Sequence, residues 1–151
     1  MLSLEEMIVR FAVALLLGAL MGFERELIGK EAGVRTLMLV SGGAAIFSII
    51  SIALPYIGAG PAALEDILGN TDFSRVASNI VVGVGFLGAG IIMKNDNRIH
   101  GLTTSALVWT AAAVGTLAGI GLVSFALITG VAVSVLLYLM RGMSIGPNGS
   151  K

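Results

Sequence analysis

The side chains that could bind a ligand are concentrated in two short segments of an otherwise apolar chain. They are Glu24, Arg25, Lys30, Arg35 and Thr36 in the first segment, and Asp96, Arg98, His100, Thr103 and Thr104 in the second. Arg35–Thr36 and Thr103–Thr104 each stand where an apolar run begins, and the free N–H groups and positive dipole of a helix start favour an anion. The same pattern also fits loop charges that only set membrane topology, with the threonines as helix caps. The sequence leaves both interpretations open.

Metal binding and catalysis are weaker alternatives for the same segments. Magnesium needs an octahedron of oxygen ligands, and the carboxylates here, Glu24, Glu26, Glu31 and Asp96, all have basic neighbours. The chain has no cysteine and one histidine, which excludes thiolate and His-rich metal centres. No nucleophile–base pair can be assembled. We therefore expect no enzymatic activity, no cofactor and no resident metal.

Two residues inside the apolar runs are further candidates. Asn79 is the deepest polar residue of its run and shares a helical face with Gly83, Phe86 and Gly90. Asparagine commonly supplies a hydrogen bond between membrane helices, and we favour that structural role over ligand binding. Trp109 is too deep for the interfacial aromatic belt and is expected to pack between helices.

The composition predicts that these residues are positioned by membrane helices. Hydrophobic residues make up 56% of the chain and charged residues 12%, with a mean hydropathy of +0.99. Soluble domains carry about a quarter charged residues, and here the charges cluster between uncharged runs. The nine basic and nine acidic residues cancel, which does not favour nucleic acid as a partner. We expect an all-α, polytopic helix bundle in the lipid bilayer.

Five membrane spans are expected, because about 20 helical residues cross a hydrocarbon core of about 30 Å. They are residues 4–23, 36–54, 76–93, 103–118 and 122–140. The last two share a run without Asp, Glu, Lys or Arg that would be about 60 Å long as one helix, so it must fold back near Gly119–Gly121. The first span is expected to be retained, because Glu5 and Glu6 replace the basic region of a signal peptide. Residues 1–143 then form one transmembrane domain, and residues 144–151 a flexible tail.

The charges predict the orientation of these spans. Five crossings place the two termini on opposite sides of the membrane. One side then holds Arg25, Lys30, Arg35, Lys94, Arg98, Arg141 and Lys151, whereas only Arg10 and Arg75 lie toward the other. The positive-inside rule assigns the richer side to the cytoplasm. The amino terminus is therefore expected outside and the carboxyl terminus in the cytoplasm.

An internal repeat relates residues 33–46 to residues 101–114. The matches are Gly33 with Gly101, Thr36 with Thr104, Leu39–Val40 with Leu107–Val108 and Ala44–Ala45 with Ala112–Ala113. On the same offset Lys30 aligns with Arg98 and Gly22 with Gly90. Chance similarity between apolar helices is the alternative. A true repeat predicts two parallel helical hairpins plus one added helix, with spans two and four starting close together at the cytoplasmic side.

Small residues within the spans indicate close helix packing. Lipid provides no hydrophobic force between helices, so glycines that allow close backbone approach take its place. The glycines expected to pack in this way are Gly18, Gly22, Gly83, Gly85, Gly88, Gly90 and Gly115. The stretch from Gly83 contains a G-x-G-x-x-G pattern, but a dinucleotide site needs that pattern between a strand and a helix.

Several short blocks of the sequence together form a recognisable pattern. They are Gly22–Glu26, Gly29–Lys30, Ala32–Thr36, Asp72, Arg75, Gly83–Gly90, Gly101–Ala106, Trp109 and Ala112–Gly115. In these blocks the chain resembles the MgtC/SapB family of bacterial inner-membrane proteins. The resemblance implies a protein that acts on other membrane systems rather than carrying magnesium itself. It also implies roles in adaptation to low magnesium and in survival of pathogens inside host cells. Many members have a soluble carboxyl-terminal domain, which this chain, ending at Lys151, is expected to lack.

Two functions follow as hypotheses. The first is a regulatory, self-associating membrane protein whose helical faces bind other membrane proteins. The alternative is a transporter or binder of a small anion or solute at the cytoplasmic side of the repeat interface. Its site would be lined by Arg35, Thr36, Thr103 and Thr104, with Glu24, Arg25, Asn79 and Trp109 also assigned to the ligand or partner site.

Overall fold

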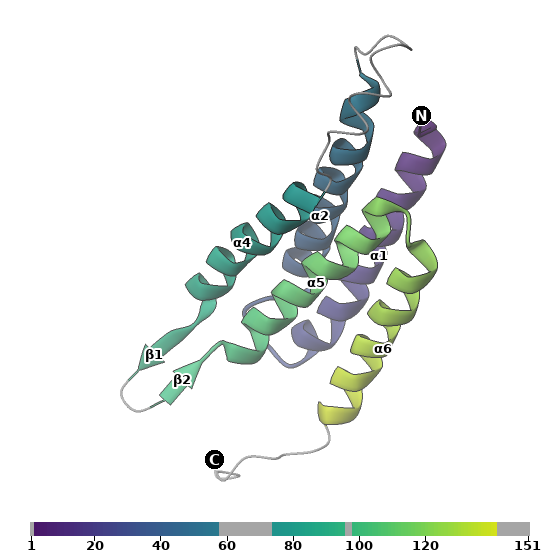
Figure 1. The fold of residues 1–151 in the computed structure, drawn as a ribbon. Coiled ribbons are helices and arrows are strands. Elements are labelled where there is room, and N and C mark those ends of the chain that lie inside the picture. Colours follow the sequence, from purple (N-terminus) through teal and green to yellow (C-terminus); the bar gives the residue numbers. More distant parts are fainter. Residues whose placement is uncertain (1, 58–73, 96–97, 142–151) are drawn as a thin grey trace.

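The chain is a helical membrane bundle. The computed structural model describes residues 2–57, 74–95 and 98–141. The elements are α1 (Leu4–Leu27), α2 (Val34–Ala53), the short 3-10 helix η1 (Leu54–Tyr56), α4 (Ser74–Ile91), β1 (Met93–Asn95), β2 (Arg98–His100), α5 (Leu102–Ile120) and α6 (Val123–Arg141), as Figure 1 shows. Four of the described helices, α1, α2 with η1, α5 and α6, are long and apolar enough to cross a membrane, and α4 is a shorter apolar helix. The expected tail at 144–151 lies outside the described residues.

The ends of the helices have local causes in the sequence. At the start of α1 the Ser3 hydroxyl accepts a hydrogen bond from the Glu6 N–H, and the Glu6 carboxylate accepts one from the Ser3 N–H, each at 3.1 Å. Helix α5 ends at Gly121, whose φ of 98° is left-handed. This turn lets α6 fold back along α5 near the position that the sequence predicts.

A two-stranded hairpin replaces the end of the third expected span. That span was expected to reach Met93, but α4 ends at Ile91, and Met93 pairs with His100 in the antiparallel β1–β2 ladder. The sequence between the strands, Asp96-Asn97, consists of residues that favour turns. This end of the bundle, with the β1–β2 hairpin and the α1–α2 connection, is called the hairpin end below.

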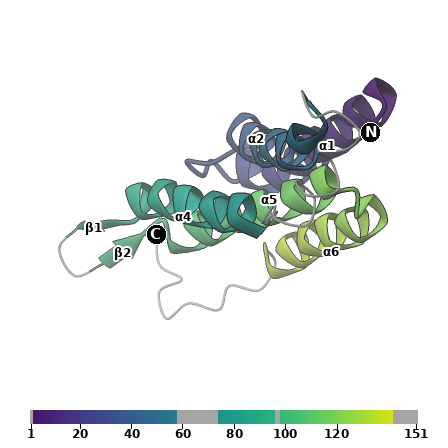
Figure 2. The same cartoon turned by 45° about the horizontal axis from the view of Figure 1, so that its top comes forward.

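The helices form two layers. Helices α1 and α2 make one layer and α4, α5 and α6 the other, with α5 in the middle facing both α1 and α2 (Figures 1 and 2). Helix α1 begins and α6 ends at opposite ends of the bundle (Figure 1). The core where the layers meet consists mainly of small side chains. Its completely buried residues include Ala14, Ala45, Ala111 and Ala118.

Glycines bring α2 into backbone contact with both α1 and α5. A Cβ at Gly22 would lie 2.6 Å from the Val34 Cα, and one at Gly18 would overlap the Leu37 carbonyl. On the other side of α2, a Cβ at Gly115 would overlap the Ser41 carbonyl oxygen. Helices at this spacing have no room for any side chain at these positions.

The two hairpins of the repeat run in the same direction but are packed differently. Helices α2 and α5 both begin at the hairpin end (Figure 1). Gly22 is tightly packed against α2, whereas its counterpart Gly90 has no atom within 4 Å of its Cβ position among the described residues, and neither have Gly83 and Gly85. Of the four glycines from Gly83 to Gly90, Gly88 contacts α5, with its Cβ position 2.6 Å from the Ser105 Oγ. That the other three pack against a helix stays a prediction.

Arg10 has a structural partner that explains a charge inside the first span. Its Nη1 donates a hydrogen bond of 3.1 Å to the Gly119 carbonyl at the end of α5. A cation at a helix carboxyl terminus is favoured by the dipole and satisfies a carbonyl that the helix leaves unpaired. This contact ties α1 to the α5–α6 turn at the end opposite the hairpin.

Candidate functional site

A polar pocket of about 370 Å³ lies at the hairpin end. It is built by the end of α1, the α1–α2 connection, β2 and the start of α5. The lining residues are Arg25, Lys30, Glu31, Ile99, His100, Gly101, Leu102, Thr103 and Thr104. Three of the predicted site residues, Arg25, Thr103 and Thr104, thus lie together. We call this site the polar pocket.

Arg25 is the buried charge of the polar pocket. The residue is only 6% exposed, because the last turns of α1 face α5. Its Nη2 donates a hydrogen bond of 3.2 Å to the Thr104 Oγ1, and its Nη1 lies 3.8 Å from the Glu24 Oε2. Within the described part of the chain, the Arg25 Nε and the Glu24 Oε2 are buried without a hydrogen-bond partner. A guanidinium has five N–H donors, so this one is incompletely used.

The start of α5 leaves backbone donors free at the same pocket. Gly101 precedes the helix with a φ of 85° and supplies no side-chain cap. Ser105 donates the first intrahelical bond to the Gly101 carbonyl at 2.8 Å. The N–H groups of Leu102, Thr103 and Thr104 therefore have no acceptor within the helix. A side chain at Gly101 would collide with the Ile91 carbonyl, so the position must be glycine.

The start of α2 differs, because the chain supplies its own anion there. The Glu26 Oε2 accepts a hydrogen bond of 2.9 Å from the Val34 N–H, the first residue of the helix. Arg35 and Thr36 are exposed on α2 and do not line the polar pocket. The structure therefore places one of the two predicted helix starts in the pocket, and the other is capped outside it. Glu26 was not predicted as a cap, since its distance along the chain from Val34 fits no local capping pattern.

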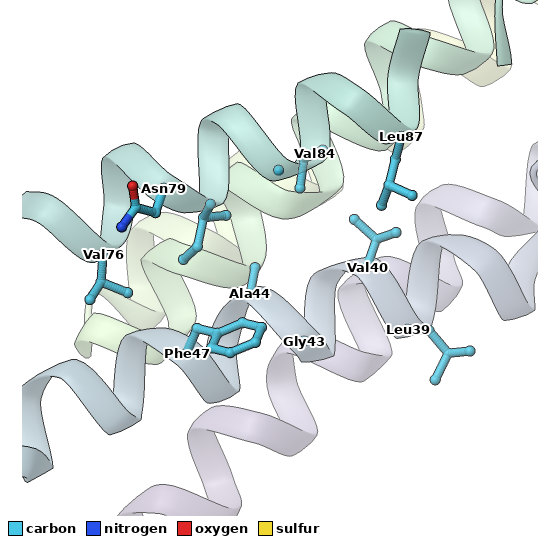
Figure 3. Close-up of a pocket in the computed structure, with 11 residues that line it drawn as sticks. Leu39, Val40, Gly43, Ala44, Phe47, Val76, Asn79, Val84 and Leu87 are labelled. Atoms are coloured by element: carbon cyan, nitrogen blue, oxygen red, sulfur yellow. The ribbon is translucent and has the colours of Figure 1, made fainter. Parts of the chain in front are cut away.

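Asn79 lies elsewhere, in an apolar groove of about 670 Å³ between α2 and α4 (Figure 3). The groove residues are Leu39, Val40, Gly43, Ala44, Phe47, Val76, Asn79, Ile80, Gly83, Val84 and Leu87. Asn79 and Val76 lie at one end, away from Val40 and Leu87 (Figure 3). We call this site the α2–α4 groove. The sequence did not predict it, because a groove depends on how far two helices separate.

Trp109 is also separate from the polar pocket. It is 50% exposed and lines a third pocket, of about 390 Å³, with Gly85 and Gly88 of α4. Its indole is therefore only partly covered by the helices of this chain. No group of three or more His, Cys, Asp or Glu that could hold a metal ion is found among residues 2–57, 74–95 and 98–141.

Comparisons with known proteins identify bacterial relatives of the chain. Protein MgtC of Brucella abortus (strain 2308) is 42% identical over 130 residues, covering 86% of this chain and 49% of the relative. Protein MgtC of Salmonella typhimurium (strain 14028s / SGSC 2262) is 40% identical, over 76% of this chain and 43% of the relative. A third relative, named "Putative magnesium transporter YhiD", from Escherichia coli (strain K12), is 37% identical over 78% of this chain and 52% of its own length.

The similarity covers most of this chain but not of the relatives. The chain spans about half the length of the curated relatives it matches. No solved structure shows significant similarity to it. The sequence model of the MgtC family matches residues 11–144, which include both the polar pocket and the α2–α4 groove. This chain therefore belongs to the MgtC family.

Proposed function

We propose that this protein is a non-enzymatic regulator of magnesium homeostasis in the bacterial inner membrane, which acts by binding other membrane proteins. Its role would lie in adaptation to low magnesium and in intracellular survival. The relatives named MgtC support this proposal through shared family membership. The relative named as a magnesium transporter motivates transport as the competing hypothesis. The observation that carries the proposal is the α2–α4 groove.

The chemistry of the groove fits one transmembrane helix of a partner protein. Its lining is apolar apart from the Asn79 amide, and Gly83 presents bare backbone with no atom within 4 Å of its Cβ position among the described residues. A glycine surface lets a second backbone approach closely, and an amide can form a hydrogen bond across the helix interface. The partner helix is therefore expected to carry small residues and a polar side chain opposite Asn79.

A groove-filling substitution tests this function. Gly83→Leu is expected to remove low-magnesium growth support in a strain that depends on this protein, while its expression and melting temperature in detergent stay at wild-type values. Leu136→Trp, which adds bulk to an exposed position on α6 away from the groove, is the matched control and should keep full growth support.

Three results would contradict the proposal. Gly83→Leu could support growth as well as the wild type, which would leave the groove without a role. A disulfide-linked dimer of Gly83→Cys in native membranes would assign the groove to a second copy of the chain. Saturable magnesium flux into vesicles reconstituted with this protein alone would favour transport over regulation.

We also propose that the hairpin end faces the cytoplasm. Arg25, Lys30, Arg35 and Lys94 belong to this end and Arg141 ends α6 there, whereas Arg10 lies toward the opposite end. The chain contains no cysteine, so single cysteines report one position each. A membrane-impermeant maleimide should label Leu122→Cys in intact spheroplasts and should label Lys30→Cys only after lysis. The reverse pattern would invert the topology.

A further inference from the structure

We infer that the polar pocket binds a phosphate-type oxyanion, either inorganic phosphate or the phosphate of a lipid headgroup. The pocket lies at the end of α1 and the start of α5, apart from the α2–α4 groove, so this inference does not depend on the proposed regulatory function. Three independent features of the described residues support it.

The first feature is the difference between the two helix starts of the repeat. At α2 the Glu26 carboxylate already accepts from the first backbone N–H, at 2.9 Å. On the offset that aligns Gly33 with Gly101, Glu26 aligns with Lys94. An ammonium group can only donate hydrogen bonds, so Lys94 cannot accept one from a backbone N–H as Glu26 does. Among the described residues, no side chain therefore caps the start of α5 in the way that Glu26 caps α2. The three free N–H groups of α5 and its dipole then favour an anion from outside the chain.

The second feature is the incompletely satisfied Arg25 guanidinium. Arg25 is about nine-tenths buried and lines the pocket beside Thr103 and Thr104, yet its Nε has no hydrogen-bond partner within the described residues. Buried polar groups are normally paired, so an unpaired donor on a side chain that lines the pocket indicates an acceptor that is missing. A planar guanidinium matches two oxygens of one phosphate.

The third feature is the charge and shape of the pocket. Arg25 and Lys30 provide two cations, against the single carboxylate of Glu31 among the lining residues. The Glu24 carboxylate lies 3.8 Å from the Arg25 Nη1 and orients the guanidinium from one side. The backbone around Gly101, with a φ of 85° before a right-handed helix, directs successive N–H groups toward one concave surface. A compact tetrahedral anion can contact this surface and Arg25 together.

Thermal unfolding of the full chain in detergent tests the inference. Inorganic phosphate, titrated at constant ionic strength, and phosphatidic acid are the two probes, with diacylglycerol of the same acyl chains as the lipid control. A melting temperature raised by inorganic phosphate identifies the free ion as the ligand. A rise with phosphatidic acid but not with diacylglycerol identifies a lipid headgroup. No rise with either phosphate compound overturns the inference.

Matched variants assign the binding to the polar pocket. Arg25→Lys keeps the charge but loses the planar fork, and the dissociation constant is expected to rise at least about tenfold. Arg35→Lys makes the same change at an exposed arginine outside the pocket and should bind like the wild type. Lys30→Gln removes an exposed lining charge and should weaken binding even if Arg25→Lys fails to fold. Unchanged affinity in Lys30→Gln, or equal loss in Arg35→Lys, would overturn the assignment.

Discussion

Gly115→Ala is expected to destabilise the bundle strongly, although it adds only one methyl group. Gly115 lies where α5 meets α2, and a Cβ there would overlap the Ser41 backbone carbonyl. The obstacle is backbone, which cannot rotate away as a side chain can, so the two helices must separate. Overpacking of this kind costs about 1–3 kcal/mol and sometimes more, and we expect a loss near the upper end, about 3 kcal/mol. Unfolding in sodium dodecyl sulfate can be followed by the fluorescence of the single tryptophan.

Gly83→Ala is the matched control, because it makes the same change on α4 in open space. No atom of the described residues lies within 4 Å of its Cβ position. Alanine is a better helix former than glycine by up to about 1 kcal/mol, so this variant should be neutral or slightly more stable. Equal effects of the two substitutions would mean that the close α2–α5 contact is not formed in the membrane.

The sequence was sufficient to predict the fold class, because the length of an apolar run determines how many times a helix crosses the bilayer. The charge-free run before Arg141 is too long for one crossing and contains Gly121, so a turn there followed from chain length and glycine together. The hairpin at Met93–His100 was not predicted, because its strands are too short to give a pattern of alternating residues. Short elements depend on tertiary contacts more than on local sequence.

The candidate site could be predicted only in part, for a related reason. Arg25, Thr103 and Thr104 meet as the repeat suggested, since parallel hairpins bring their connections to the same end of the bundle. The repeat also predicted that α2 would contribute Arg35 and Thr36, and the structure places both outside the polar pocket. Two helix starts that align in the repeat can have different hydrogen-bond partners. At α2 the Glu26 carboxylate caps the helix start, and the alignment of the two repeats alone does not show this contact.

Arg25→Met is expected to be the most destabilising charge substitution at the hairpin end. Glu24 is 7% exposed, and its carboxylate lies 3.8 Å from the Arg25 guanidinium. Removal of the cation leaves a buried carboxylate without a counter-charge and removes a hydrogen bond to the Thr104 Oγ1. Breaking a buried ion pair from one side costs about 3–5 kcal/mol. The same detergent unfolding experiment measures this loss.

The double variant Glu24→Leu/Arg25→Met distinguishes the cost of the unpaired charge from the value of the pair itself. Replacement of both members of a buried pair by apolar residues is often neutral or stabilising, so the double variant should regain most of the stability that Arg25→Met loses. The double variant could instead lose as much stability as Glu24→Leu and Arg25→Met lose together when each is measured alone. The two side chains would then not be coupled, and the buried contact at 3.8 Å would be wrong. A folded double variant would also lack the guanidinium of the polar pocket. It should therefore fail to bind phosphate while staying stable, which would mean that Arg25 is retained for its ligand and not for the stability of the bundle.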